Sequence, residues 1–282
     1  MILFSKMQGT GNDFIIIDCM KQYFNYSLNI LAKYLCNRNF AIGADGVIFL
    51  FKSYKADCKM RIFNSDGTEA EMCGNGIRCV AKYLYEKEIT TKKYIKIETK
   101  FDVKELELVF ENKKVSNVKV KINKPIFDIR KLPVFLSKEE IHKEICDIKI
   151  LIDGVEYKLY LLSLGNPHAV CFVNDFDNID IVKVGSIIEN YKYFPNKTNV
   201  EFVKIIDRNN IKIIVWERGV GETLSCGTGA CASVACGIKS KFLENSVNVE
   251  LDGGRLNIFM EEDDNIILSG ECELVFDGKI NL

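Results

Sequence analysis

The chain has 282 residues, of which 48% are hydrophobic and 27% charged, and its formal net charge is −1. These values are close to globular averages and exclude collagen-like, coiled-coil and disordered classes. No basic excess is available to bind the phosphates of nucleic acid or acidic lipid, so neither partner is expected. The length predicts one large domain or two medium ones.

The cysteines indicate a reducing compartment. There are eleven, an odd number without framework spacing, which favours free thiols over structural disulfides. The N-terminus lacks the pattern of a signal peptide, and no apolar run reaches the ~18 residues that span a bilayer. We therefore expect a cytoplasmic protein with no membrane partner. Six cysteines lie in apolar contexts and are expected to be buried small hydrophobic residues: Cys19, Cys36, Cys58, Cys146, Cys171 and Cys272.

The first half of the chain is rich in predicted strands. Alternating or continuous apolar runs predict strands over 2–6, 14–18, 46–51, 58–63, 94–99, 105–110 and 115–122. A loop over 8–13 joins the first two strands, and 28–36 has helical spacing. A second helix is predicted after Cys73, because apolar residues recur there at i, i+3, i+4 and i+7 from Ile77.

A domain boundary is expected at Lys124 and Pro125, because proline cannot continue the interior of a sheet. Further strands are predicted over 157–164, 169–173, 200–206, 211–216, 247–251, 256–260, 266–268 and 273–276. Helices are predicted over 137–146, from a capping-box pattern, over 179–191, and after Cys226. The last helix has small residues on every side over 230–237, so we expect a sheet to wrap it.

One short pattern occurs twice, 153 positions apart. Cys73 and Cys226 each open a predicted helix with the motif C-G-x-G. The loop with Gly11 and Asn12 is echoed at nearly the same offset by 165–166. The pattern predicts two homologous halves with a cleft between them. Similarity outside these motifs is weak, so chance resemblance of two strand-loop-helix units is the alternative.

A cysteine in the first turn of a helix meets unpaired N–H groups and the positive end of the macrodipole, which should stabilise its thiolate. The glycines of both motifs leave room for an anionic group to reach those N–H donors. A carboxylate held between two such helix starts would have a thiol on either side. One thiolate could remove the α-proton while the other thiol returns a proton to the opposite face. This arrangement predicts inversion at a carbon atom.

Other uses of the cysteines must be weighed. Each one alone reads as a buried small residue near a helix start. Zinc binding by Cys73 with Cys79, or by Cys226 with Cys231 and Cys236, is disfavoured because the spacings match no usual zinc motif. Positions i, i+5 and i+10 also diverge around a helix. We expect no metal.

A second group of residues is suited to a zwitterion. Arg218 can hold a carboxylate with two hydrogen bonds, and Glu217 beside it can accept from an ammonium group. A surface ion pair is the ordinary alternative. Asparagines lie in predicted loops at strand ends, where backbone reasons alone make them common: Asn12, Asn64, Asn166 and Asn199. His168 follows Pro167 and could simply begin a strand.

Taken together, these segments resemble the diaminopimelate epimerase family. They lie in order over nearly the whole chain: QGTGNDF at 8–14, NSDG at 64–67, MCGNGIRC at 72–79, GNPHA at 165–169, TNVEF at 198–202, ERGVGET at 217–223 and GACA at 229–232. The resemblance implies a two-domain α/β (α+β) fold. Each pseudo-symmetric half would be a mixed, largely antiparallel sheet or barrel around a central helix, with the active site in the cleft.

The same resemblance implies domains over 1–124, completed by a returning C-terminal strand at 272–282, and over 125–271. It implies an isomerase that needs neither pyridoxal phosphate nor metal and interconverts LL- and meso-diaminopimelate for lysine or peptidoglycan precursors. The expected partner is therefore a small-molecule substrate, and a homodimer is left open.

The resemblance also implies roles for residues. Cys73 and Cys226 would be the acid/base pair, and His168 and Glu217 would support catalysis. The reacting carboxylate would lie against Gly74, Asn75, Gly227 and Thr228. The distal end of the substrate would be held by Asn64, Asn166, Asn199, Glu217 and Arg218, with Asn12 lining the same cleft. The chain departs from one branch of the family at Gly46, where a glutamine can contact ligand, so this position is left out of the site.

Three rivals remain. A proline or hydroxyproline racemase would share the paired thiols, but its small substrate has no distal carboxylate for Arg218. A thiol redox protein would form a switchable disulfide from the same two cysteines, although dedicated redox sites usually carry C-x-x-C. A non-catalytic binding module would keep the Asn and Arg residues without requiring both cysteines.

Overall fold

The computed structural model describes residues 1–70, 72–136 and 147–282. It divides into two compact units, which we call unit 1 (Met1–Lys121 with Ser269–Leu282) and unit 2 (Ile122–Leu268). The sequence had suggested changes of domain after 124 and after 271. The helix predicted over 137–146 lies outside the described residues. Within the described part of the chain, no helix combines the length and hydrophobicity needed to cross a membrane.

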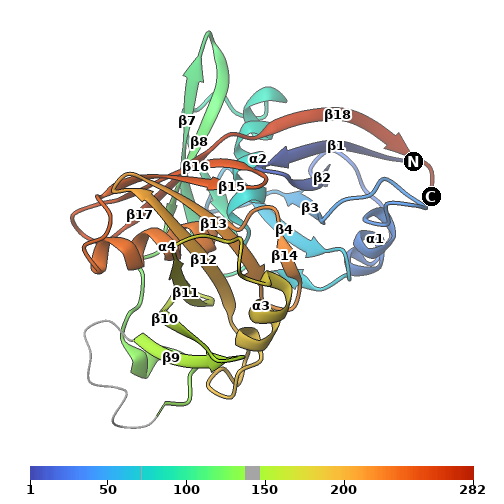
Figure 1. The fold of residues 1–282 in the computed structure, drawn as a ribbon. Helices are drawn as coiled ribbons and strands as arrows, with labels where there is room; N and C mark the ends of the chain where they lie inside the picture. The colour runs from blue at the N-terminus through green and yellow to red at the C-terminus, as the bar shows by residue number, and fades with distance from the viewer. Residues whose placement is uncertain (71, 137–146) are drawn as a thin grey trace. The chain divides into compact units, whose positions relative to one another are not determined.

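In its described residues, unit 1 is mainly β-structure and contains the helices α1 and α2 (Figure 1). Its elements are β1 (Ile2–Gly9), β2 (Asn12–Asp18), α1 (Leu28–Leu35), β3 (Gly46–Phe51), β4 (Cys58–Asn64), β5 (Glu69–Ala70), α2 (Gly74–Glu86), β6 (Tyr94–Glu98), β7 (Val103–Glu111), β8 (Lys114–Ile122) and β18 (Glu273–Ile280). The C-terminal strand β18 pairs with β1, so the chain returns to its first strand as expected.

The strands of unit 1 form a mixed sheet around α2. β1 pairs antiparallel with β18 and β2, β2 runs parallel to β3, and β3 is antiparallel to β4. β4 pairs antiparallel with β5 and parallel with β6, from which β7 and β8 continue antiparallel. Helix α2 packs against β1, β2, β4, β6, β7 and β18. Its apolar stripe faces this sheet, since Ile77, Val80, Ala81 and Leu84 are fully buried.

Unit 2 has a closely matching set of elements. They are η1 (Ile129–Lys131), β9 (Asp147–Ile152), β10 (Val155–Ser163), β11 (Pro167–Val173), α3 (Ile181–Glu189), β12 (Asn199–Asp207), β13 (Asn210–Glu217), β14 (Gly221–Thr223), α4 (Gly227–Lys239), β15 (Ser246–Leu251), β16 (Gly254–Met260) and β17 (Ile266–Gly270). The chain returns to unit 1 at Ser269, so the last two residues of β17 belong to unit 1.

The pairing in unit 2 repeats that of unit 1 strand for strand. β10 pairs antiparallel with β9 and β11, β11 runs parallel to β12, and β12 is antiparallel to β13. β13 pairs antiparallel with β14 and parallel with β15, which is antiparallel to β16. The equivalent strands of unit 1 have the same directions, so the predicted internal repeat and its two pseudo-symmetric halves are confirmed. The described strands form open mixed sheets rather than closed barrels.

The central helices α2 and α4 match at both ends. Each is 13 residues long and follows its cysteine directly. Each terminates before a non-glycine residue with positive φ, Glu88 at 55° and Lys241 at 62°. The next N–H then bonds back to a carbonyl of the last turns, from Ile89 to Leu84 and from Phe242 to Gly237. This 6→1 bond is the Schellman ending of a helix.

Helix α4 is wrapped on all sides, as its composition predicts. Fully buried residues include Ala230, Cys231, Ala232, Ser233, Val234, Ala235 and Cys236. Small side chains let neighbouring segments approach the helix closely. A Cβ added at Gly237 would lie 2.3 Å from a methyl carbon of Leu243, so only glycine fits there without repacking.

The sequence prediction differs from the structure in a few places. The loop predicted over 8–13 is a tight hairpin turn, because Thr10 and Gly11 both have positive φ and Gly9 pairs with Asn12. Strands β5, β9 and β14 were not predicted. Among the six cysteines expected to be buried, Cys19 is half-buried, Cys146 lies outside the described residues, and the others are buried.

Candidate active site

The two repeated cysteines occupy the same position in the same local structure. Cys73 and Cys226 are the N-cap residues of α2 and α4, with φ and ψ of −135° and 119° in one case and −123° and 111° in the other. Each sulfur accepts a hydrogen bond from the third N–H of its helix, that of Gly76 or Gly229, at 3.4 Å. A thiol thus takes the place of the usual N-cap oxygen, beside the positive end of the helix.

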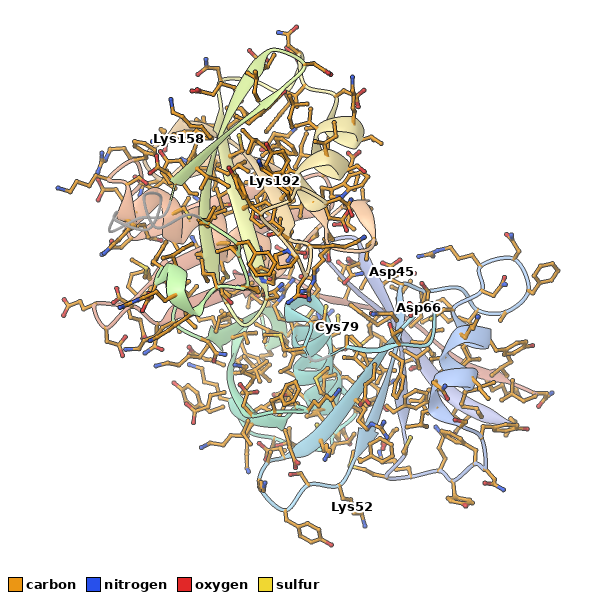
Figure 2. The ribbon with its side chains drawn as sticks, turned by 90° about the horizontal axis from the view of Figure 1, so that it is seen from below. Asp45, Lys52, Asp66, Cys79, Lys158 and Lys192 are labelled. Atoms are coloured by element: carbon orange, nitrogen blue, oxygen red, sulfur yellow. The ribbon has the colours of Figure 1, made fainter. Side chains whose placement is uncertain are left out.

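In unit 1, Asn12 connects Cys73 to a surface carboxylate. The thiol of Cys73 lies 3.6 Å from Oδ1 of Asn12, and Nδ2 of Asn12 donates to Asp45 at 2.7 Å. Asp45 also accepts from the backbone N–H of Asp13 and from Arg38. The amide of Asn12 is therefore oriented with its oxygen toward the thiol. Figure 2 labels Asp45, which precedes β3, and Cys79 within α2.

The other predicted residues of unit 1 lie near the same strand and helix ends. Asn64 ends β4 opposite Gly46 and donates to the hydroxyl of Thr68 at 3.1 Å. Asn75 in the first turn of α2 is buried, and its Oδ1 accepts from the hydroxyl of Thr10 at 3.3 Å. A Cβ added at Gly46 would lie only 2.8 Å from a carbonyl oxygen of β4. A glutamine at that position would require the backbone to move.

In unit 2, the strand topology gathers four predicted residues at one end of the sheet. β11 and β12 start side by side, with His168 opposite Asn199, and β13 ends there because it is antiparallel to β12. Nδ2 of Asn199 donates to the carbonyl of Pro167, and its Oδ1 accepts from the backbone N–H of Arg218. Glu217 accepts from the hydroxyl of Thr223 at 2.6 Å.

Asn166 links this strand end to the start of α4. Its Nδ2 donates to Oγ1 of Thr228 at 3.3 Å, and that hydroxyl lies 3.5 Å from the sulfur of Cys226. Nε2 of His168 lies 3.1 Å from Oδ1 of Asn166. Nδ1 of His168 lies 2.7 Å from Oε1 of Glu201, and both side chains are fully buried.

The start of α4 favours the thiolate of Cys226, as expected, but other groups outweigh it in setting the pKa of this thiol. Burial, followed by the carboxylates of Glu217 and Glu201, raises the pKa of the Cys226 thiol well above its ordinary value. The hydroxyl of Thr228 and the N–H of Gly229 act in the opposite direction but do not prevail. Removal from water opposes ionisation more strongly than these two donors favour it. Cys226 is therefore a thiol at neutral pH.

Sequence reasoning missed four polar residues that support the predicted ones. Thr10, Asp45 and Arg78 lie in unit 1, and Glu201 lies in unit 2. Arg78 is fully buried and donates to the carbonyl of Gly74 at 3.1 Å and to the hydroxyl of Thr10 at 2.9 Å. The available signal was a charged residue inside an apolar pattern, as with Arg78 between Ile77 and Cys79 or Glu201 between Val200 and Phe202.

Metal ligands do not gather in the described residues. Across the positions that the structure places, no three His, Cys, Asp or Glu side chains form a group that could hold an ion. The chemistry that these two helix starts offer is proton transfer by thiols beside donors suited to a carboxylate.

Comparison with known proteins identifies the same family over most of the chain. The family model described as diaminopimelate epimerase matches residues 4–127 and 160–275. A protein of Brachyspira hyodysenteriae named diaminopimelate epimerase is 46% identical over 280 residues, covering 99% of both chains. A protein of Methanococcus maripaludis with the same name is 43% identical over the same length and with the same coverage.

Two solved structures share this fold at low sequence identity. A probable proline racemase from Agrobacterium radiobacter aligns with a TM-score of 0.72 at 14% identity, covering 100% of this chain and 93% of its own. A PhzF-family phenazine biosynthesis protein from Bacillus anthracis aligns at 0.68 with 16% identity, covering 100% and 99%. These similarities show the fold, and the full-length sequence matches show the relationship. The chain belongs to the diaminopimelate epimerase family.

Proposed function

We propose that this chain interconverts LL- and meso-diaminopimelate by proton transfer between Cys73, Cys226 and the α-carbon, without pyridoxal phosphate or metal. The observation that carries the proposal is the repeated N-cap cysteine. Two thiols with the same backbone geometry, each beside the N–H donors of its own helix, are what a two-base inversion requires. Membership of the family supports diaminopimelate as the substrate.

The proposed reaction requires one thiol to act on each face of the α-carbon, with N–H donors available to the substrate carboxylate. The thiolate of Cys73 removes the α-proton and becomes a thiol. The negative charge that develops on the carboxylate is stabilised by N–H groups of the first turns, including those of 74–75 and 227–228. The thiol of Cys226 then gives its proton to the opposite face and becomes a thiolate. The reverse direction exchanges these roles.

The distal end of the substrate is assigned to the strand ends. Arg218 would bind the second carboxylate with two hydrogen bonds, and Glu217 would accept from the ammonium group. The backbone of Arg218 is held by Asn199, which supports a defined position for its side chain. Asn12, Asn64 and Asn166 supply further amide groups. The proposal requires no partner other than a small-molecule substrate.

The eleven cysteines, an odd number without framework spacing, support a reducing compartment such as the cytoplasm. There the product would serve lysine or peptidoglycan synthesis, as the family name suggests.

The test is proton exchange in deuterated water. Reduced protein is incubated with LL-diaminopimelate, and the meso product is isolated and examined for deuterium at the α-carbon. We expect deuterium in the product, because a protein donor that equilibrates with solvent supplies the new proton.

A parallel incubation with L-proline separates the rival activity. Exchange on proline without exchange on diaminopimelate would contradict the proposal.

Loss of activity on oxidation, with recovery after addition of a thiol reductant, is expected if the two sulfurs can approach each other. Insensitivity to oxidant would count against facing thiols.

A further inference from the structure

A buried carboxylate lies behind the start of α4. The side chain of Glu201, on β12, has no exposed surface. Its Oε1 contacts Nδ1 of His168 at 2.7 Å, whereas its Oε2 has no hydrogen-bond partner among the described residues. A half-satisfied buried carboxylate is costly. Its presence in the core therefore calls for a functional reason.

The hydrogen bonds determine where the protons on His168 and Glu201 lie. Asn166 donates to Thr228 through Nδ2, so its Oδ1 faces Nε2 of His168. An amide oxygen only accepts, and Nε2 must therefore carry a proton. The 2.7 Å contact between Nδ1 and Glu201 needs one further proton, either on the imidazole or on the carboxyl group. His168 and Glu201 together are therefore neutral in both forms.

His168 and Glu201 are connected to the first turn of α4 in two ways. The first runs from Glu201 through His168 and Asn166 to Thr228, whose hydroxyl touches the sulfur of Cys226. The second is direct packing. A Cβ added at Gly229 would lie 2.9 Å from Oε1 of Glu201, and the N–H of Gly229 holds the sulfur of Cys226.

We propose that Glu201 is a positioning residue for the epimerisation, acting through His168. It holds His168 with a proton on Nε2, and this orients the amide of Asn166 toward Thr228 and the carboxylate cradle beside Cys226. The inference rests on the proposed function for its effect on catalysis. The titratable groups that face Glu201 are His168 on β11 and the thiols of Cys226 and Cys236 at α4.

Two substitutions separate positioning from simple packing. Glu201→Gln can still donate an amide hydrogen to Nδ1 and keep the proton on Nε2. Glu201→Met has a similar length but makes no such bond. We expect the methionine variant to lose about tenfold or more in kcat, as orienting partners of active-site groups typically do. The glutamine variant should retain kcat within about threefold.

The unfolding temperature separates these losses from instability. Glu201→Met leaves the buried Nδ1 of His168 without its partner, so this variant should unfold at a lower temperature than wild type, and kcat is compared at a temperature at which both proteins remain folded. In the double variant His168→Asn/Glu201→Met, kcat should fall no further than in His168→Asn alone, because both changes break one chain of contacts. Full activity of Glu201→Met, or an equal loss in Glu201→Gln, would overturn the proposal.

A second measurement needs no substrate. The chain has two histidines, so the ring ¹⁵N signals of His168 are those that vanish in His168→Asn. We expect a protonated Nε2 in wild type and Glu201→Gln, and averaging between tautomers in Glu201→Met. Averaging in the wild type would refute the positioning role. If wild type instead failed to epimerise diaminopimelate, the proposed function would fall while the tautomer result stood.

Glu189 provides a matched control. It is a buried carboxylate of the same unit, but it accepts from the indole of Trp216 and the N–H of Gly219 rather than from a histidine. Glu189→Gln should lower the unfolding temperature without changing the signals of His168. A change in those signals would show that they report general loosening of unit 2, and the proposal would fall.

Discussion

The starts of α2 and α4 share one backbone design but are supported by different side chains. Beside Cys73, the amide of Asn12 is oriented by Asp45, an exposed carboxylate that also pairs with Arg38. The equivalent amide in unit 2 is oriented by buried groups, His168 and Glu201. The two units therefore share the cysteine cap and the helix endings but differ in the polar side chains that support the cap. An exposed carboxylate and a buried histidine–glutamate pair can each orient an amide beside the start of a helix.

The largest expected effect tests whether the two halves are equivalent in chemistry. Cys73→Ala and Cys226→Ala should each lower epimerisation by roughly 10²–10⁴-fold, the usual contribution of a positioned acid or base. Product formation is measured for each variant, with circular dichroism to check the fold. Substantial turnover in either variant would show that one thiol suffices and would rule out the two-base scheme.

The next effect concerns the charge around Cys226. Burial, then Glu217 and Glu201, raises the pKa of this thiol well above the ordinary value. In a Cys73→Ser background, its alkylation by iodoacetamide should therefore be slow at pH 7 and still be rising above pH 9, because only the thiolate reacts. Peptide mass spectrometry follows the modified site.

Removing one negative charge should reverse part of this shift. Glu217→Gln in the same background should lower the pKa of Cys226 and speed its alkylation at pH 8 by about threefold or more, since one pKa unit is worth tenfold in the thiolate population. An unchanged rate would show that the carboxylate of Glu217 does not contribute to the raised pKa of Cys226.

A smaller effect is expected at the support of unit 1. Asp45→Ala removes an exposed hydrogen bond to Asn12, so kcat should fall by about 2–10-fold, in line with the usual net value of one hydrogen bond. Because this support is exposed, the wild-type activity should also weaken somewhat at high salt. If kcat of Asp45→Ala fell as far as that of Glu201→Met, the exposed support of unit 1 and the buried support of unit 2 would be equally important for catalysis.

The smallest effect is one of stability. Burial raises the pKa of Asp13, but Arg38 and Lys6 outweigh it and bring the pKa from 3.8 to about 2. A folded-state pKa below the unfolded value adds stability above the unfolded value, and this is lost as the pH falls toward the folded one. Asp13→Asn should therefore lower the free energy of unfolding at pH 7 by about 1–2 kcal/mol, after allowance for solvent screening.

Urea titrations of this variant at several pH values check the sign, because the difference from wild type should shrink between pH 4 and pH 2. Asp153→Asn is the control in unit 2. Asp153 is exposed, and among the ion pairs of the described chain it pairs only with the exposed Lys183. Asp153→Asn should therefore change the free energy of unfolding by no more than about 0.5 kcal/mol. An equal loss in both variants would remove the special role of Asp13.

Local signals in the sequence were enough for the helix starts and most strands. The motif C-G-x-G with an apolar stripe after it defines a capped helix, because capping and periodicity involve only near neighbours. β3 has the predicted bounds, 46–51. The short strands β5 and β14 carry two and three residues, too few for a period to be visible.

Glu201 shows where local reasoning ends. Alternation in β12 places Glu201 on one face with Asn199 and Val203, and a strand with one polar face is ordinarily solvated on that side. Both helices α3 and α4 pack against β12, so its first five residues are buried. The burial of that carboxylate depends on chain segments far away in sequence, and so does its bond to His168.

The sequence by itself therefore determined the paired cysteine motifs and the family, since these depend on residue order within short segments. It predicted the internal repeat, which the matching strand pairings of the two units confirmed. The tertiary structure decided which amide faces which support, and that Cys226 rests as a thiol. These properties follow from desolvation and from contacts between β11, β12 and α4, which no local pattern encodes.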